Sequence, residues 1–101
     1  MTDTQALSKA HKVILQTLTQ YVPVVARVHG GNHPEFHEVH ALFNAIKEKT
    51  KRSTQVKPEL AEEFAKLRAI TGNYAVPNDV CESYEAVYKM LAELDKAYQI
   101  G

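Results

Sequence analysis

The chain has 101 residues, the size of one domain that can bury a core without disulfide bonds. Its 12 basic and 12 acidic residues cancel, so no net field favours nucleic acid or an anionic membrane as a partner. No apolar run approaches the ~20 residues of a membrane span, and the start M-T-D-T-Q-A-L-S-K lacks the pattern of a signal peptide. With one cysteine, Cys81, the composition predicts a small cytoplasmic protein with a single domain, 1–101.

The first helix is expected over roughly 4–29. Its apolar positions recur at spacings of three and four residues, which is typical of one helix face. These positions are Leu7, His11, Ile14, Leu18, Tyr21, Val25 and Val28. Pro23 interrupts the helix and is expected to kink it. Gly30 and Gly31 are expected to end it through a left-handed turn.

The second helix is expected over roughly 34–51. Pro34 suits the first turn of a helix, and Glu35 is favourable near the positive end of the helix dipole. The buried stripe is expected to contain Phe36, Val39, Phe43 and Ile46.

The third and fourth helices are expected over roughly 58–71 and 78–99. Pro58 opens the third helix and Gly72 ends it. Apolar residues in these helices again keep helical spacing: Leu60, Phe64, Leu67, Val80, Tyr84, Val87, Leu91, Leu94 and Tyr98. Because short connections join amphipathic helices, the chain is expected to form an all-α, up-down-up-down four-helix bundle.

Four of the five histidines lie in the stretch H-G-G-N-H-P-E-F-H-E-V-H, residues 29–40. At about 100° per residue, His33, His37 and His40 share one flank of the second helix, beside its buried stripe. Spacings of four and three residues put their rings one turn apart, close enough for two or three to bind one transition metal. The pattern predicts a metal site at these three residues, with His29 as a further ligand.

A simpler interpretation competes with this metal site. Histidines at a helix start are often solvated, or they cap the preceding helix with a ring N–H. On the helical projection, Glu35 and Glu38 point away from the histidine flank, so no carboxylate is expected beside the imidazoles. His11 lies in the apolar stripe of the first helix, where a hydrogen-bonded core histidine is favoured over a ligand.

Catalysis has thinner support in the sequence. Cys81 lies near the expected start of the fourth helix, and no histidine is fixed beside it in sequence, so a partly buried structural cysteine is expected. The tyrosines at helical spacing indicate core packing. The chain has no nucleophile elbow, phosphate loop or paired thiol motif, which makes a small enzyme using Cys81 the least favoured reading.

Two stretches of the chain point to a family. V-P-V-V-A-R-V-H-G-G-N-H-P-E-F-H-E-V-H-A-L-F, residues 22–43, resembles the first helix pair of the RIC (repair of iron centres) proteins, which are hemerythrin-like di-iron proteins. L-R-A-I-T-G-N-Y-A-V-P-N-D-V-C-E-S-Y-E-A-V-Y-K-M-L-A-E-L, residues 67–94, resembles the start of their last helix and the turn before it. The V-H-G-x-N-H-P and Y-x-x-P-x-x-x-C patterns are fairly specific, and the two stretches keep the family's order.

The resemblance implies a hemerythrin-like bundle and a link to the repair of iron–sulfur clusters damaged by nitric oxide or peroxide. In the family, histidines and bridging glutamates hold two irons inside the bundle. Here those ligand positions fall near Ser8, near Ser53 to Lys57, and near Lys57 or Pro58, and the chain ends at Gly101, where the last ligand pair would begin. The resemblance therefore implies a shortened relative without the di-iron centre. Iron or another transition metal is the candidate cofactor for the histidines of residues 29–40.

Two functions remain open from the sequence. In the first, a RIC-related stress protein handles iron through the histidines of residues 29–40, without substrate turnover. In the second, a metal-free bundle pairs with itself as a homodimer, or with a full-length RIC protein, along the apolar stripes of its first and fourth helices. Because neutral imidazoles bind metals, the first function predicts that metal affinity weakens below about pH 6.

Overall fold

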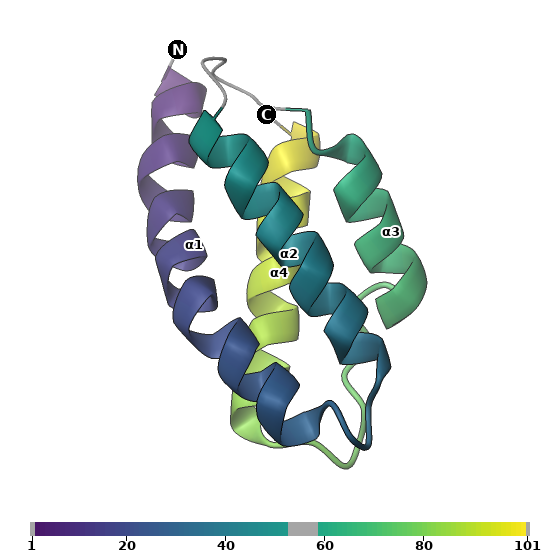
Figure 1. Cartoon of the computed structure of the whole chain (residues 1–101). Helices are drawn as coiled ribbons and strands as arrows, with labels where there is room; N and C mark the ends of the chain where they lie inside the picture. Colours follow the sequence, from purple (N-terminus) through teal and green to yellow (C-terminus); the bar gives the residue numbers. More distant parts are fainter. Residues whose placement is uncertain (1, 53–58, 101) are drawn as a thin grey trace.

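The computed structural model describes residues 2–52 and 59–100, with the side chains of 12–51 and 59–99. Its helices are α1 (Thr2–His29), α2 (Glu35–Arg52), α3 (Ala61–Thr71) and α4 (Glu82–Ile100). They alternate in direction, with α1 and α3 on opposite sides and α2 and α4 between them (Figure 1). The all-α, up-down-up-down four-helix bundle expected from the sequence is confirmed.

The core lies between the four helices and is mainly apolar. The stripes expected on α2, α3 and α4 are buried; their fully or nearly fully buried members are Phe36, Val39, Phe43, Ile46, Leu60, Phe64, Leu67, Tyr84, Val87, Leu91 and Leu94. The α4 stripe is therefore inside the bundle. The prediction that this stripe forms a surface for pairing was wrong, because the helix uses it to pack within its own chain.

The buried face of α1 is rotated from the stripe expected from its heptad-like spacing. Leu18 and Val25 are buried as expected, but Tyr21 is 39% exposed and Val28 is 63% exposed. A strict heptad repeat drifts by about 20° per heptad around a straight helix, which carries its ends off the buried face. The helix instead buries two residues outside the expected stripe, Val22 and Ala26.

Gly30 follows α1, but it does not turn the chain through a left-handed conformation as expected. Among the described glycines, only Gly72 has a positive φ. The Gly30 N–H donates to the Ala26 carbonyl at 2.9 Å, which continues the helical pattern by one residue. A Cβ at Gly30 would collide with the His37 ring and with the Ala26 carbonyl. The glycine is needed here because the first turn of α2 packs closely on the end of α1.

Two helices begin later than expected. α3 begins at Ala61 and not at 58, because Leu60 is not helical and donates its backbone N–H to the Tyr98 hydroxyl at 2.9 Å. Pro58 itself lies outside the described residues. α4 begins at Glu82 and not at 78, so that Cys81 directly precedes the helix.

The end of α3 agrees with the sequence. Gly72 adopts the left-handed conformation, with φ 61° and ψ 48°, and its N–H donates to the Arg68 carbonyl. Only glycine adopts this conformation without strain from a Cβ, which explains why T-G-N ends the helix here.

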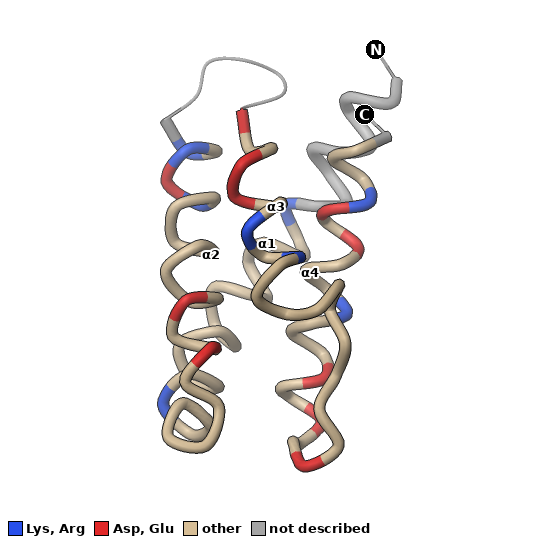
Figure 2. Tube along the Cα trace, turned by 90° about the vertical axis from the view of Figure 1, so that its right-hand side faces the viewer, with Lys and Arg blue, Asp and Glu red and all other residues tan. Residues whose placement is uncertain are grey.

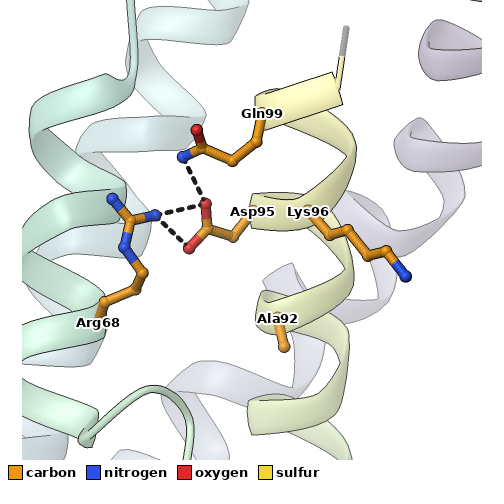
Figure 3. Close-up of a pocket in the computed structure, with 5 residues that line it drawn as sticks. All are labelled: Arg68, Ala92, Asp95, Lys96 and Gln99. Carbon is orange, nitrogen blue, oxygen red and sulfur yellow. Dashed lines mark hydrogen bonds and ion pairs between the residues drawn. The ribbon is translucent and has the colours of Figure 1, made fainter.

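An ion pair with a buried carboxylate links α3 to α4. Arg68 lies 2.6 and 2.7 Å from the two carboxylate oxygens of Asp95, which is only 4% exposed. Asp95 also accepts hydrogen bonds from the Tyr74 hydroxyl at 2.8 Å and the Gln99 amide at 3.1 Å. Figure 3 shows Arg68, Asp95 and Gln99 converging beside an open pocket of about 330 Å³. Since the carboxylate already accepts from three side chains, we assign the Arg68–Asp95 pair a structural role.

Charged residues of both signs lie along α4, whereas in α2 they gather near its two ends (Figure 2). The longest uncharged stretch is in α1, where residues 13–26, between Lys12 and Arg27, include no Asp, Glu, Lys or Arg. Even so, none of the described helices is long and apolar enough to cross a membrane.

Candidate functional site

Three segments meet at the lower end of the bundle in Figure 1: the end of α1, the start of α2 and the connection that enters α4. This meeting point follows from the up-down-up-down topology, which brings alternate helix ends together. Five side chains with metal-binding or acid–base chemistry lie there, and we refer to them as the junction cluster. They are His29, His33, Glu35, Asp79 and Cys81.

His29 and Cys81 form the first pair of the junction cluster. The His29 Nε2 lies 3.1 Å from the Cys81 Sγ, so the thiol can donate to the imidazole. His29 is the last residue of α1, and the Cys81 carbonyl accepts the Glu85 N–H at 3.1 Å in the first turn of α4. Cys81 is exposed. The prediction of a partly buried cysteine was therefore wrong, and the histidine beside Cys81 comes from a part of the chain that is distant in sequence.

His33 forms the second part of the junction cluster and faces two carboxylates. Its Nδ1 lies 3.1 Å from Glu35 Oε2, and its Nε2 lies 3.1 Å from Asp79 Oδ1. The His33 side chain is only 13% exposed. The prediction that no carboxylate lies beside the imidazoles was wrong. His33 precedes α2, so the helical projection does not apply to it, and Asp79 comes from another part of the chain.

A neutral His33 ring cannot donate a hydrogen bond to both carboxylates. A neutral imidazole has one N–H and one lone pair, so it donates to only one carboxylate and turns its lone pair toward the other. Two acceptors would then face each other at 3.1 Å. A second proton on the ring resolves this repulsion, and so does a cation held between the imidazole and a carboxylate.

Aromatic rings form the inner wall of the junction cluster. The Tyr84 ring centroid lies 5.4 Å from those of both His29 and His33, and 5.0 Å from that of Phe36. Tyr84 is fully buried and shares a hydrogen bond of 3.0 Å with the Tyr88 hydroxyl. Burial, helped by this hydrogen bond and by the Glu35 charge, raises the pKa of Tyr84 far above its ordinary value. Tyr84 therefore stays protonated and acts as a wall, not as an anionic ligand.

The structure brings together two of the four histidines predicted as ligands. The ring centroids of His29 and His33 lie 6.5 Å apart. His37 is exposed and lies against Gly30, and neither His37 nor His40 has a hydrogen bond or ring contact with the other two among the described residues. In the described part of the chain, no three His, Cys, Asp or Glu side chains already converge at metal-binding distances.

The described interior of the bundle does not offer the ligands of a di-iron centre like the one in the RIC proteins. The buried residues there are mainly apolar, and the two buried carboxylates already have cationic partners. Glu63 lies 2.7 Å from the Lys49 ammonium, and Asp95 is paired with Arg68. The side chain of His11, and the positions near Ser8 and within 53–58, lie outside the described part.

No family model matches the chain. A search of solved structures found no significant match.

Sequence reasoning missed Asp79, and it considered Cys81 and Glu35 without placing them beside the histidines. The signal that could have found them is the topology itself. An up-down-up-down bundle places the end of the first helix, the start of the second and the start of the fourth at one end, so V-P-N-D-V-C had to lie near H-G-G-N-H-P-E.

Proposed function

We propose that the protein binds a transition metal at the junction cluster, with ferrous iron as the leading candidate, and handles iron for iron–sulfur cluster repair under nitrosative or oxidative stress. The observation that carries this proposal is the meeting of the His29–Cys81 pair with the His33–Asp79 pair at one end of the bundle. The role is binding and delivery, without substrate turnover.

The donor set suits the proposed chemistry. Two imidazoles and a carboxylate favour iron(II), and a thiolate broadens the choice to zinc and cobalt. Glu35 would accept the N–H on the other side of the His33 ring, as carboxylates commonly do for metal-bound histidines. The cluster therefore holds candidates both for ligands and for the group that orients one of them.

The distances require a modest closure of the cluster around an ion. Ligand atoms bound to one tetrahedral ion lie about 3 to 4 Å apart, and the two pairs, each at 3.1 Å, are near that separation. Two imidazoles on one ion have ring centroids about 5 Å apart. The His29 and His33 centroids, at 6.5 Å, must therefore approach by about 1 to 2 Å. Both residues flank a short loop, and Asp79 and Cys81 are exposed, which allows this movement by side-chain rotation.

The biological process rests on the resemblance to the RIC proteins, through the V-H-G-x-N-H-P and Y-x-x-P-x-x-x-C patterns. These two patterns contain His29, His33 and Cys81. The resemblance and the geometry thus concern the same residues, which supports iron–sulfur cluster repair in the cytoplasm as the setting.

The proposal is tested on the full chain without a histidine tag, loaded anaerobically with ferrous iron, with bound metal measured by mass spectrometry. We expect near-stoichiometric iron in the wild type. In His29→Ala/His33→Ala, the amount of bound iron should fall at least about tenfold. The matched control is His37→Ala/His40→Ala, which removes the same number of histidines outside the junction cluster and should keep its iron.

Other results would overturn the proposal. Iron lost in the control and kept in the first variant would move the site to the flank of α2. No bound metal in the wild type would favour the alternative function, a metal-free interaction module that pairs with itself or with a full-length RIC protein.

If the wild type binds iron, the repair role is tested by asking whether the iron-loaded protein restores the activity of a dehydratase whose [4Fe–4S] cluster has been damaged by nitric oxide.

A further inference from the structure

The His29–Cys81 pair combines a free, exposed thiol with a base at contact distance. The Cys81 Sγ lies 3.1 Å from the His29 Nε2, and the cysteine is exposed. A small molecule in solution therefore reaches the sulfur, and the imidazole beside it can accept the thiol proton. The pair has the two reacting groups of an activated thiol, a nucleophile and a base from different helices.

The inner wall of the junction cluster supports the His29 ring. Its centroid lies 5.4 Å from that of Tyr84, and the two ring planes are nearly perpendicular, at 83°. Tyr84 is fully buried, so this edge-to-face contact gives the imidazole a fixed support. A group that orients the base is the third part of an activated nucleophile.

Acidic side chains lie beside Cys81 where the chain enters α4 (Figure 2). Asp79 is two positions before Cys81, Glu82 directly follows it, and both are exposed. Lys89, the first lysine of α4, is already paired with Glu85 at 2.9 Å. The local field is therefore negative, and such a field attracts cationic molecules and repels anionic ones.

The other two segments at the junction do not reverse this field. α1 contributes Arg27, two positions before His29, whereas the first turn of α2 contributes Glu35 and Glu38. Acidic side chains therefore outnumber basic ones around the pair, and a cation approaches the sulfur more readily than an anion does.

We propose that Cys81 is a site of reversible S-thiolation by small cationic disulfides, with His29 as the base. The reaction takes place on the metal-free protein. It therefore does not rest on the proposed metal site, although both use the same sulfur.

The reaction is a thiol–disulfide exchange. His29 takes the proton of the Cys81 thiol, and the thiolate attacks one sulfur of the small disulfide, so that a new S–S bond forms as the old one breaks. The released half leaves with the electron pair of the broken bond and takes up the proton that His29 holds. Cys81 is oxidised to a mixed disulfide, and one half of the small disulfide is reduced to a thiol.

The mixed disulfide is the end product within one chain. The chain has a single cysteine, so no second thiol of the same chain can attack the new bond. The modification stays until a thiol from solution removes it, which makes it stoichiometric and reversible.

The test compares three aliphatic disulfides of similar length: cystamine, which is cationic, 2-hydroxyethyl disulfide, which is neutral, and dithiodipropionate, which is anionic. Metal-free protein with a chelator is mixed with each one, and formation of the mixed disulfide is followed by mass spectrometry. Each rate is divided by the rate of the same disulfide with N-acetylcysteine amide, a neutral thiol. We expect the normalised rate with cystamine to exceed that with dithiodipropionate at least about fivefold. The difference should shrink in 1 M salt, where the Debye length is about 3 Å.

Variants separate the base from the field. His29→Gln removes the base and should slow the exchange at least about tenfold with all three disulfides. His40→Gln is the matched control, since it removes a histidine outside the junction cluster, and it should leave the rates unchanged. Asp79→Asn/Glu82→Gln should reduce the preference for cystamine and keep the rate with the neutral disulfide within about threefold.

Two results would overturn the proposal. The first is an equal normalised rate with the cationic and the anionic disulfide in the wild type, a comparison that needs no variant. The second is an exchange as fast in His29→Gln as in the wild type, with the helix content confirmed by circular dichroism. If His29→Gln loses helix, the wild-type comparison decides. Because the chelator keeps metal away, a failure of this reaction is distinct from a failure of metal binding.

Discussion

His29 and Cys81 lie 52 positions apart in the sequence, yet the imidazole Nε2 and the thiol Sγ are 3.1 Å apart. The pair exists because α1 ends where α4 begins, at one end of the bundle. It places the single cysteine of the chain next to a histidine, and this combination can be detected by spectroscopy.

Cobalt(II) reports on a thiolate ligand by intense near-ultraviolet absorption. We expect the wild type to show this absorption and Cys81→Ser to lose it, with a metal affinity at least about tenfold lower, since serine keeps the size of the side chain but removes the sulfur. His40→Ala should keep both the absorption and the affinity. Identical spectra for wild type and Cys81→Ser would show that the thiol is not a ligand.

Gly30→Ala should destabilise the fold. The new Cβ meets the His37 ring and the Ala26 carbonyl, and the carbonyl belongs to the backbone and cannot rotate away. We expect a loss of about 1 to 3 kcal/mol in the free energy of unfolding, measured by urea denaturation.

Gly31→Ala is the matched control for that substitution. A Cβ at Gly31 has no neighbour within 4 Å, and the residue does not have a positive φ. This variant should be neutral, or more stable by up to about 1 kcal/mol, because alanine reduces the freedom of the unfolded chain. Equal effects at both glycines would contradict the close packing of α2 on the end of α1.

Asp95→Asn should lower the free energy of unfolding by more than the loss of an exposed ion pair does. The change removes the charge that faces Arg68, and an amide cannot accept from Arg68, Tyr74 and Gln99 as a carboxylate does. Because Arg68 is partly exposed, we expect about 2 kcal/mol and not the larger cost of a fully buried pair.

Lys89→Ala is the comparison, since it removes an ion pair that is exposed on the surface. Lys89 is paired with Glu85 at 2.9 Å, but both side chains are exposed, and the loss should stay within about 0.5 kcal/mol. Denaturation curves that shift equally for Asp95→Asn and Lys89→Ala would remove the structural role assigned to the buried pair.

The Glu63–Lys49 pair predicts a loss of stability in acid. Burial opposes ionisation of Glu63, but the hydrogen bond from Lys49 and the Lys49 charge outweigh it and lower the pKa of Glu63 below 4.5. A lowered pKa means that the stabilisation is fully present above the unfolded-state pKa and is lost as the pH falls through the folded-state pKa.

Urea denaturation from pH 6 down to pH 3 measures this loss. The decline in the free energy of unfolding below pH 4.5 should be shallower in Glu63→Gln than in the wild type, because the variant has no proton to take up at this position. Parallel declines would assign the acid sensitivity to other carboxylates.

The sequence predicted the helices because their signals are local. The spacing of Phe36, Val39 and Phe43 defines a buried face without knowledge of any other helix, and Gly72 carries its own preference for a left-handed conformation. The expectations were wrong where packing against another helix decides which residues are buried. Val28 continues a heptad pattern, but the packing of α1 leaves it exposed.

The candidate site was half predictable for the same reason. His29 and His33 lie four positions apart, and their closeness was visible in the sequence. Asp79 and Cys81 join them from a segment about 50 positions later, and only the tertiary fold brings these residues together. The metal site itself stays a prediction until binding is measured.

Tyr84 gives the protein a built-in optical reporter. Its ring packs against both His29 and His33, and the chain has no tryptophan to dominate the fluorescence. Only five tyrosines contribute to the emission, and one of them is the wall of the junction cluster. Any ligand that draws the two imidazoles together changes the surroundings of that ring, so occupancy can be followed in the unlabelled protein by the quenching of tyrosine emission.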